Sequence, residues 1–311
     1  MLDSVLGQNI AVSYLKKVVE GKITSPLLLI GSEGVGRKFS VLEAIKEMVS
    51  LKGGASSITQ VSQGAHPDVM VVAPPLGKDL GVEAVREVIE RSGNYPSIAP
   101  NRFFVLDGVD KMTSAAANAI LKTIEEPPAL SLFFLLAESY DQVIPTIRSR
   151  CGRVPYWKLP ESLIFERISK FEKDSDKALV YTRMSEGSLG KAFRYWGSSK
   201  VLVRDQAFNI LQSSIAGELP LVFSMVDECK ELSLVLKFLT FLVHDLMLYS
   251  LDPSRIMNQD ILEDLGNLRV SQPLLQGFWL SLKEVWERNE SSYINLPFQL
   301  KSAVATTFSG K

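Results

Sequence analysis

The sequence predicts an α/β domain built on a parallel sheet, followed by segments that are entirely helical. Four short apolar runs, each bounded by turn residues, suit strands that are buried on both faces of a sheet. These runs are LLLI (27–30), VMVV (69–72), FFVL (103–106) and LFFLL (132–136). Helical patterns lie between them, and alternation of strands and helices is typical of a parallel sheet covered on both sides. After about Tyr156 the strand signals stop and helical patterns continue.

Two amphipathic helices are expected within the α/β part. In residues 81–92 and 113–126 the apolar side chains recur at helical spacing, which places them on one face of each helix. Thr113 is a suitable N-cap for the second helix, and Pro127 with Pro128 ends it. The residues of the two apolar faces are Val82, Val85 and Ile89 in the first helix, and Ala117, Ile120, Leu121 and Ile124 in the second.

The remainder of the chain is predicted to form two helical domains. One helix opens at residues 160–162, another runs through residues 177–185, and a third starts near Gly187. Longer helices follow from about Lys200, and one of them has an apolar face made by Leu232, Leu236, Leu239, Leu242 and Val243. Boundaries near residues 156 and 200 therefore divide the chain into domains of residues 1–156, 157–200 and 201–311.

The composition excludes several classes of protein. Of the 311 residues, 46% are hydrophobic and 22% are charged, as in soluble proteins with real cores. The net charge of −1 argues against a free-standing nucleic-acid binder, which usually has a basic excess. Two cysteines, Cys151 and Cys229, cannot build a disulfide framework or a cysteine-rich metal site.

The sequence gives no sign of secretion or of a membrane span. The first ten residues have no basic stretch followed by an apolar core, so a signal peptide is not expected. The most apolar later stretch, residues 232–251, contains Lys237, His244 and Asp245, which favours a buried amphipathic helix over a membrane span. A cytoplasmic protein without membrane contact is expected.

A phosphate-binding loop is predicted where the first strand meets a helix. The segment GSEGVGRK (31–38) follows the LLLI run, and its glycines Gly31, Gly34 and Gly36 would let backbone N–H groups surround a phosphate. However, Arg37 stands where the motif GxxxxGK[ST] has its lysine, and Lys38 stands where it has the hydroxyl that binds magnesium. The shape of the loop is retained and its catalytic content is not, so ATP binding is expected to be weak or absent.

A second acidic motif lies at the end of the FFVL strand. The sequence DGVD (107–110) follows that strand, at the edge of the sheet where a metal-binding Asp and a water-activating Glu belong. Asp107 could hold magnesium, but the next residue is Gly108, which cannot act as a base. Taken alone, Asp107 and Asp110 are equally well explained as turn and cap residues.

Several motifs together resemble the bacterial clamp-loader AAA+ family. The strongest is DGVDKMTSAAANAILKTIEEPP (107–128), which is similar to the family's stretch from DEAD to LEEPP, followed by TIRSRC (146–151) with the SRC motif. Further matches are LGQ (6–8), HPD (66–68) and GSLGKA (187–192), and NLPFQLKSAV from Asn295 is a weak one. The resemblance covers residues 1–200 well and the rest by helical pattern only.

The resemblance implies an AAA+ P-loop domain at 1–156, a small helical lid at 157–200 and a helical collar at 201–311. A defective phosphate loop with a retained SRC motif fits the delta-prime branch of DNA polymerase III clamp loaders. The implied partners are gamma/tau and delta subunits, with the sliding clamp and primed DNA reached through the assembled complex. Arg150 is then the arginine finger that acts on ATP held by a neighbouring subunit. Arg148 is expected to be a structural ion-pair partner.

The sequence also departs from the family pattern. The gamma and delta-prime branches carry a four-cysteine zinc module before HPD, whereas residues 51–65 here contain no cysteine, so no zinc is expected. His66 is then a structural turn residue, and Cys151 a small packed residue rather than a nucleophile.

Two alternatives remain open from the sequence. The chain could be an active gamma-type AAA+ motor, although Arg37, Lys38 and Gly108 argue against an intact ATPase site. It could also be an unrelated P-loop enzyme such as a small-molecule kinase, a class with no use for the SRC stretch or the helical last third. The first interpretation, a subunit without its own ATPase activity, is therefore preferred.

Overall fold

The computed structural model describes residues 1–75, 77–197, 200–291 and 294–309. The chain forms two compact units. The first contains residues 1–164 and 186–191, and the second contains residues 165–185 and 192–311. The boundaries predicted near residues 156 and 200 stay predictions, and the second lies beside residues 198–199, which are outside the described residues.

A five-stranded parallel sheet forms the centre of the first unit. Its strands lie in the order β2-β3-β4-β1-β5, and every pairing between neighbours is parallel. The strands are β1 (Leu27–Ile30), β2 (Val69–Val72), β3 (Arg102–Asp107), β4 (Ser131–Ala137) and β5 (Gly152–Pro155). The four apolar runs of the sequence therefore lie in strands, which confirms the predicted α/β class.

The strand β5 has no counterpart in the sequence prediction. Its four residues, GRVP, are paired with β1 from Leu27 to Ile30. Only Val154 is fully buried, and the strand contains both Gly152 and Pro155, residue types that are depleted in strands. The strand β5 therefore forms because it pairs with β1, and not because its own residues favour a strand.

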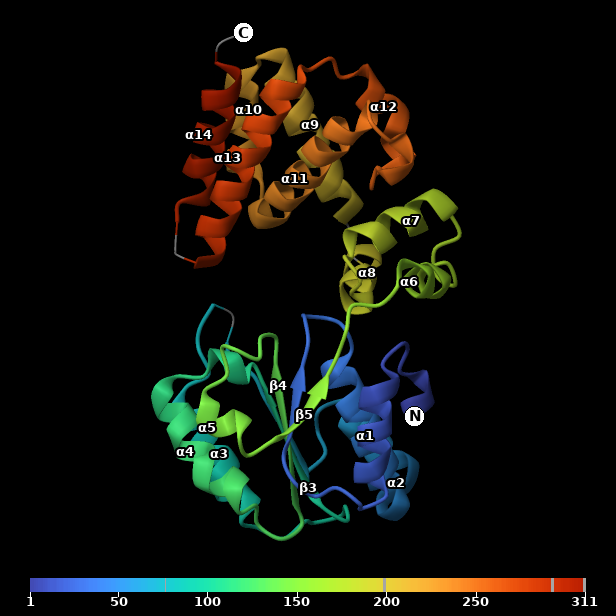
Figure 1. Ribbon diagram of the computed structural model, residues 1–311, viewed down its shortest axis with the longest axis vertical. Helices are drawn as coiled ribbons and strands as arrows, with labels where there is room; N and C mark the ends of the chain where they lie inside the picture. Colours follow the sequence, from blue (N-terminus) through green and yellow to red (C-terminus); the bar gives the residue numbers. More distant parts are fainter. Residues whose placement is uncertain (76, 198–199, 292–293, 310–311) are drawn as a thin grey trace. The chain divides into compact units, whose positions relative to one another are not determined.

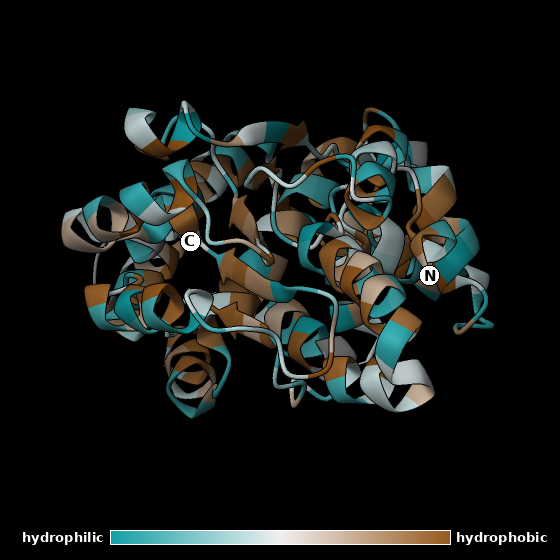
Figure 2. Cartoon of the chain, turned by 90° about the horizontal axis from the view of Figure 1, so that it is seen from below, coloured by the Kyte–Doolittle hydropathy of each residue, from teal (hydrophilic) through white to brown (hydrophobic). Residues whose placement is uncertain are grey.

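Helices cover both faces of the sheet (Figure 1). The helices α1 (Asn9–Val19) and α2 (Arg37–Ser62) lie on one side, and α3 (Val82–Ser92), α4 (Ser114–Glu125) and α5 (Pro145–Arg148) lie on the other. Side chains alternate along each strand, so neighbouring residues enter opposite cores: Phe103 and Val105 face α1 and α2, while Phe104 and Leu106 face α3 and α4. The strands β1, β3 and β4 are accordingly buried along most of their length, and the helices in Figure 2 carry both hydrophobic and hydrophilic residues.

The caps of α4 agree with the sequence analysis. The hydroxyl of Thr113 accepts a hydrogen bond from the backbone N–H of Ala116, which makes Thr113 the N-cap. The helix ends at Glu125, ahead of Pro127 and Pro128. Ala117, Ile120 and Ile124 are buried against the sheet.

Residues 51–62 belong to a helix. Here α2 continues past a kink at Gly54, whose φ of 61° and ψ of −153° are not helical, and it ends at Ser62. Ser57 and Val61 on this last part are buried. The segment that the sequence resemblance associates with a zinc module is thus an extension of α2.

The second unit consists of packed helices. They are α7 (Ser175–Met184), α9 (Lys200–Ala216), α10 (Leu219–Glu228), α11 (Leu232–Tyr249), α12 (Leu262–Asn267), α13 (Gln272–Ser291) and α14 (Leu296–Phe308). The helices α6 (Glu161–Ile168) and α8 (Leu189–Trp196) each contribute residues to both units. Short 3₁₀ turns at Leu2–Ser4, Val109–Lys111, Pro253–Arg255 and Gln259–Ile261 complete the described elements.

The helix α11 is the central helix of the second unit. By length and composition alone it could cross a membrane. It packs against α9 and α13, however, and all five residues of the predicted apolar face are buried. Its Asp245 is also buried, and the carboxylate accepts hydrogen bonds from the backbone N–H groups of Met257 and Asn258. Burial in a helical bundle therefore explains its apolar character.

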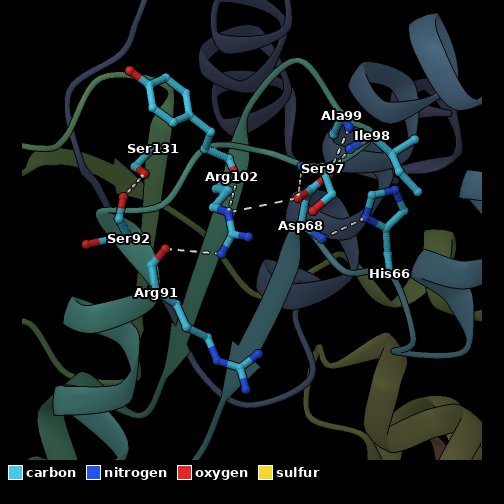
Figure 3. A network of polar contacts seen from close by, with 10 residues as sticks. His66, Asp68, Arg91, Ser92, Ser97, Ile98, Ala99, Arg102 and Ser131 are labelled. Atoms are coloured by element: carbon cyan, nitrogen blue, oxygen red, sulfur yellow. Dashed lines mark hydrogen bonds and ion pairs between the residues drawn. The ribbon is translucent and has the colours of Figure 1, made fainter.

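A network of polar contacts centred on Asp68 fastens the loop before β3 (Figure 3). The Asp68 carboxylate is buried and accepts hydrogen bonds from the backbone N–H groups of Ser97, Ile98 and Ala99, at 2.7 to 2.8 Å. Burial by itself would raise the pKa of Asp68, but these three N–H groups, with the nearby His66, hold it below its ordinary value. The carboxylate therefore stays ionised and keeps the loop ordered.

His66 has a structural role in the same network, as predicted. Its Nδ1 accepts a hydrogen bond of 3.1 Å from the backbone N–H of Asp68, so the ring proton lies on Nε2. The side chain is buried, and Nε2 has no hydrogen-bond partner among the described residues. Burial lowers the pKa of His66, although the Asp68 carboxylate opposes this effect.

We expect His66 to make folding stability depend on pH between about 7.5 and 5. The unfolded chain binds a proton at His66 as the pH falls through about 6.5, whereas the folded chain stays neutral until a lower pH. This contribution to the free energy of unfolding is therefore complete above that pH and decreases below it. Urea unfolding measured across this range will show the slope.

The matched control is His66→Asn, whose side-chain oxygen can accept the Asp68 N–H but cannot be protonated. The difference in slope between wild type and this variant isolates His66 from His244 and from the carboxylates. Identical slopes would contradict the assignment.

Candidate functional site

The predicted phosphate loop connects β1 to α2. Residues 31–36 leave the carboxyl end of β1, and α2 starts at Arg37 with Gly36 as its N-cap. Backbone N–H groups at the start of a helix attract anions, so the loop has the shape of an anion site. The residues that follow decide what chemistry this shape can support.

Arg37 does not present a free cation at the surface of the loop. Its side chain is buried, and Nη1 has no hydrogen-bond partner among the described residues. The guanidinium lies near the buried phenol of Tyr156, which is hydrogen-bonded to Ser40 at 2.5 Å. Burial raises the pKa of Tyr156 to about 12, although the Ser40 hydrogen bond and the Arg37 charge oppose it. The guanidinium is thus directed into the protein and not toward a phosphate at the surface of the loop.

The side chains of Lys38 and Asp107 form an ion pair at the place where a magnesium ion would be needed. The Nζ atom of Lys38 lies 3.6 Å from Oδ2 of Asp107. Both side chains are partly exposed, so the pair contributes little to stability. An ammonium group at this position repels a divalent cation and neutralises the carboxylate that would bind it. The donors at the end of β3 therefore do not suit magnesium.

The two residues after Asp107 have structural explanations. Gly108 has a φ of +86°, and a Cβ atom there would lie 3.0 Å from Cδ of Pro74. The carboxylate of Asp110 accepts hydrogen bonds from the backbone N–H groups of Glu138 and Ser139, which follow β4. Asp110 is therefore a residue that fixes a turn, as one of the two sequence interpretations held. A catalytic base at position 108 would need a different backbone.

The segment 187–191 lies directly against the loop. The hydroxyl of Ser188 donates to the carbonyl of Glu33 at 2.9 Å, and the N–H of Gly190 donates to the carbonyl of Gly34 at 2.9 Å. A Cβ atom on Gly190 would lie 2.9 Å from the Cα of Gly34. This approach of two backbones requires glycine at position 190. In the sequence this segment is visible only as a family resemblance, and its contact with the loop arises in the folded chain.

Gln8 joins the loop to the chain that leaves the sheet. Its Nε2 donates to the carbonyls of Val35 and Trp157, and its Oε1 accepts from the N–H of Trp157. The side chain is almost completely buried. Gln8 was noted in the sequence as part of a motif, but its contact over 149 positions depends on the folded chain.

Arg150 lies between α5 and β5. Its Nε donates to Oε2 of Glu125 at 2.8 Å, and its Nη1 donates to the carbonyl of Thr146 at 3.2 Å. Arg148, two residues earlier, forms an ion pair of 3.5 Å with Asp141 and stacks on the ring of Tyr140. The prediction that Arg148 is a structural partner is confirmed.

Cys151 packs against the core between the sheet and α3–α4. Burial raises the pKa of its thiol to about 12. A thiol with such a pKa is almost never a thiolate near neutral pH, so Cys151 is not an activated nucleophile. This agrees with its interpretation as a small packed residue.

Arg150 and the phosphate loop lie at opposite ends of the strands of the sheet. Gly152, just after Arg150, is in register with Leu27 at the start of β1, whereas the loop follows Ile30 at the end of β1. Four residues of strand separate the two levels by roughly 13 Å, which is more than an extended arginine side chain can span. Arg150 therefore cannot act on its own loop.

Among the described residues, no group of three His, Cys, Asp or Glu side chains is placed to hold a metal ion. His66 binds backbone, Asp107 is paired with Lys38, and Asp110 binds backbone. The site consists of a glycine-containing loop at a helix N-terminus, a lysine–aspartate pair and, at the other end of the strands, a partly exposed arginine.

Comparison with known proteins finds subunits of DNA polymerase III and of replication factor C. Residues 7–159 match a family model described as DNA polymerase III, delta subunit. The chain is 34% identical over 154 residues to the DNA polymerase III subunit delta' of Escherichia coli, a match that covers 47% of this chain and 46% of that one. It is 28% identical over 210 residues to replication factor C subunit 3 of Saccharomyces cerevisiae, covering 64% of this chain and 57% of that one. The chain thus spans about half the length of these relatives.

A solved structure shows the same fold. The crystal structure of a DNA polymerase III, gamma subunit-related protein from Thermotoga maritima superimposes with a TM-score of 0.50 at 19% sequence identity. The likeness covers 96% of this chain and 98% of that one. It extends over the helical part of the chain, which the family model over residues 7–159 does not cover.

Replacing Gly108 by Glu is expected to destabilise the protein rather than to supply a base. A non-glycine residue at this positive φ costs about 1–2 kcal/mol, and the added Cβ meets Pro74. The free energy of unfolding of Gly108→Glu, measured in urea, should fall by at least that amount. Gly21→Ala is the control, since Gly21 has a φ of +71° but no atom within 4 Å of an added Cβ. A Gly108→Glu protein as stable as wild type would refute the backbone constraint.

Proposed function

We propose that the chain is a delta-prime-type clamp-loader subunit, because residues 7–159 match the family model described as DNA polymerase III, delta subunit. In this role it assists the ATP-dependent loading of the sliding clamp onto primed DNA. The AAA+ fold predicted from the sequence is present, with a parallel five-stranded sheet and a helical remainder. Family and fold together support a place in a replication assembly.

The proposed partners follow from the same family. Gamma/tau and delta subunits would form the complex with this chain, and the clamp and primed DNA would be reached through that complex. The helices of residues 201–311 would join the chain to its neighbours as a collar. The near-neutral charge of −1 fits a subunit that meets DNA through an assembly and not alone. A cytoplasmic location is part of the proposal.

The chain is proposed to have no ATPase activity of its own. Three observations support this: Arg37 is turned into the protein, Lys38 pairs with Asp107, and Gly108 has no side chain to activate water. The loss of a positioned general base alone costs about 10²–10⁴-fold in rate. ATP binding is proposed to be weak or absent, and no bound zinc is expected.

The position of Arg150 carries the proposal. It is beyond reach of the loop in its own chain, and it belongs to a segment that resembles the family's SRC motif. A guanidinium that meets the phosphates of ATP in a neighbouring subunit can raise the rate of hydrolysis by about 10³–10⁵. Arg150 is therefore proposed to act in trans, as an arginine finger.

The purified chain alone should not hydrolyse ATP above background. The measurement is phosphate release with magnesium, compared with Asp107→Asn. Magnesium-dependent hydrolysis that Asp107→Asn abolishes would support the alternative, an active gamma-type motor. Calorimetry with ATP, with and without magnesium, separates passive binding by the Arg37 loop from catalysis.

Arg150→Ala should lower ATP hydrolysis by the assembled clamp loader in the presence of clamp and primed DNA. The fall should be partial if several sites hydrolyse ATP and only one of them faces this subunit. Folding and assembly should be preserved, because a partly exposed ion pair contributes little stability. Arg150→Lys should remain defective, since lysine keeps the charge but lacks the planar fork of donors.

The control for lost charge is Arg153→Ala, which removes an exposed arginine from the same segment. Gel filtration establishes that each complex is intact before its rate is compared. Unchanged hydrolysis in an intact Arg150→Ala complex would refute the action in trans.

A further inference from the structure

The guanidinium of Arg150 is held by two neighbouring elements. Its Nε donates to the carboxylate of Glu125, the last residue of α4. Its Nη1 donates to the carbonyl of Thr146 in α5 and lies 3.4 Å from the hydroxyl of Ser149. Nη2 makes no hydrogen bond to any residue that the structure describes. Two of the three nitrogen atoms thus fix the side chain, and the third remains available.

The local sequence explains why Glu125 stands at this point. The helix α4 ends at Glu125, because residues 126–128 turn away through two prolines. The carboxyl end of a helix carries partial negative charge, which together with the carboxylate favours a cation beside it. The short helix α5 brings Arg150 to that end, since α4 and α5 are in contact.

The contact is poorly suited to stabilising the fold. The side chain of Glu125 is 55% exposed and that of Arg150 is 31% exposed, so water screens their attraction. Holding a long arginine side chain in one conformation also costs rotamer entropy. The effect of the contact is instead to fix the orientation of the Arg150 side chain.

We propose that Glu125 is a positioning residue, which holds Arg150 so that Nη2 is presented to the phosphates in the neighbouring subunit. This inference rests on the proposed action of Arg150 in trans. A guanidinium that is oriented in advance loses less freedom when it meets the transferring phosphoryl group. Without the carboxylate, Arg150 would keep its charge, but its side chain would no longer be held in one orientation.

The test compares Glu125→Gln with Glu126→Gln in the assembled complex with clamp and primed DNA. Glu126 is the matched control, because it is the adjacent residue, is also exposed, and its side chain has no hydrogen bond or ion pair among the described residues. Glu125→Gln should lower kcat for the Arg150-dependent part of ATP hydrolysis by about three- to tenfold, with KM for ATP unchanged. Glu126→Gln should leave both constants as in wild type.

A double substitution separates positioning from a general structural effect. If Glu125 acts through Arg150, the protein with both Arg150→Ala and Glu125→Gln should hydrolyse ATP at the rate of Arg150→Ala alone. Additive losses, an unchanged kcat in Glu125→Gln, or an equal loss in Glu126→Gln would overturn the inference while leaving the action in trans intact. An Arg150→Ala complex with wild-type kcat would overturn the action in trans itself, and this inference with it.

Discussion

The parallel register of β1 between β4 and β5 is the constraint on which the rest of the structure depends. All four residues of β1 are buried, and the strand is paired from Leu27 to Ile30 on both sides. This one pairing puts the phosphate loop at the carboxyl ends of the strands and Arg150 at their amino ends. The same sheet brings Asp107, at the end of β3, to the level of the loop. The positions of the phosphate loop and of Arg150 thus depend on a hydrophobic strand that itself has no reactive residue.

The proposed absence of ATPase activity would depend on the backbone as well as on side chains. Lys38 and Asp107 satisfy each other, which removes the unbalanced negative charge that attracts a metal ion. The positive φ of Gly108 and the contact between Gly34 and Gly190 are properties of the chain path. The bonds from Ser188 and Gly190 end on carbonyls of the loop, so they do not depend on which side chains the loop carries. Changing Arg37 and Lys38 would remove the ion pair with Asp107 but would leave these backbone contacts in place.

The sequence predicted those parts of the fold that are determined by local pattern. Buried strands with several consecutive apolar residues, and helices with a cap such as Thr113, are visible before folding. The strand β5 was missed because its residues fit a strand only beside β1, and the extension of α2 was missed because Gly53 and Gly54 suggest a break. At the candidate site, the residue types of Arg37, Lys38, Asp107 and Arg150 were visible. The contacts around the site were not visible. Glu125 binds Arg150 and Gln8 binds Trp157, and these residues are far apart in the sequence, so no local pattern predicts the contacts.

The buried state of Cys151 has a practical consequence for experiments on this protein. Maleimide and related reagents attack the thiolate, and burial raises the pKa of both native cysteines, Cys151 and Cys229. Both native thiols are therefore expected to react slowly with such reagents near neutral pH. A single new cysteine on an exposed position, such as that of Ser149 beside the arginine, could carry a dye without removal of the native thiols. The movement of this segment during assembly could then be followed by energy transfer to a dye on another subunit.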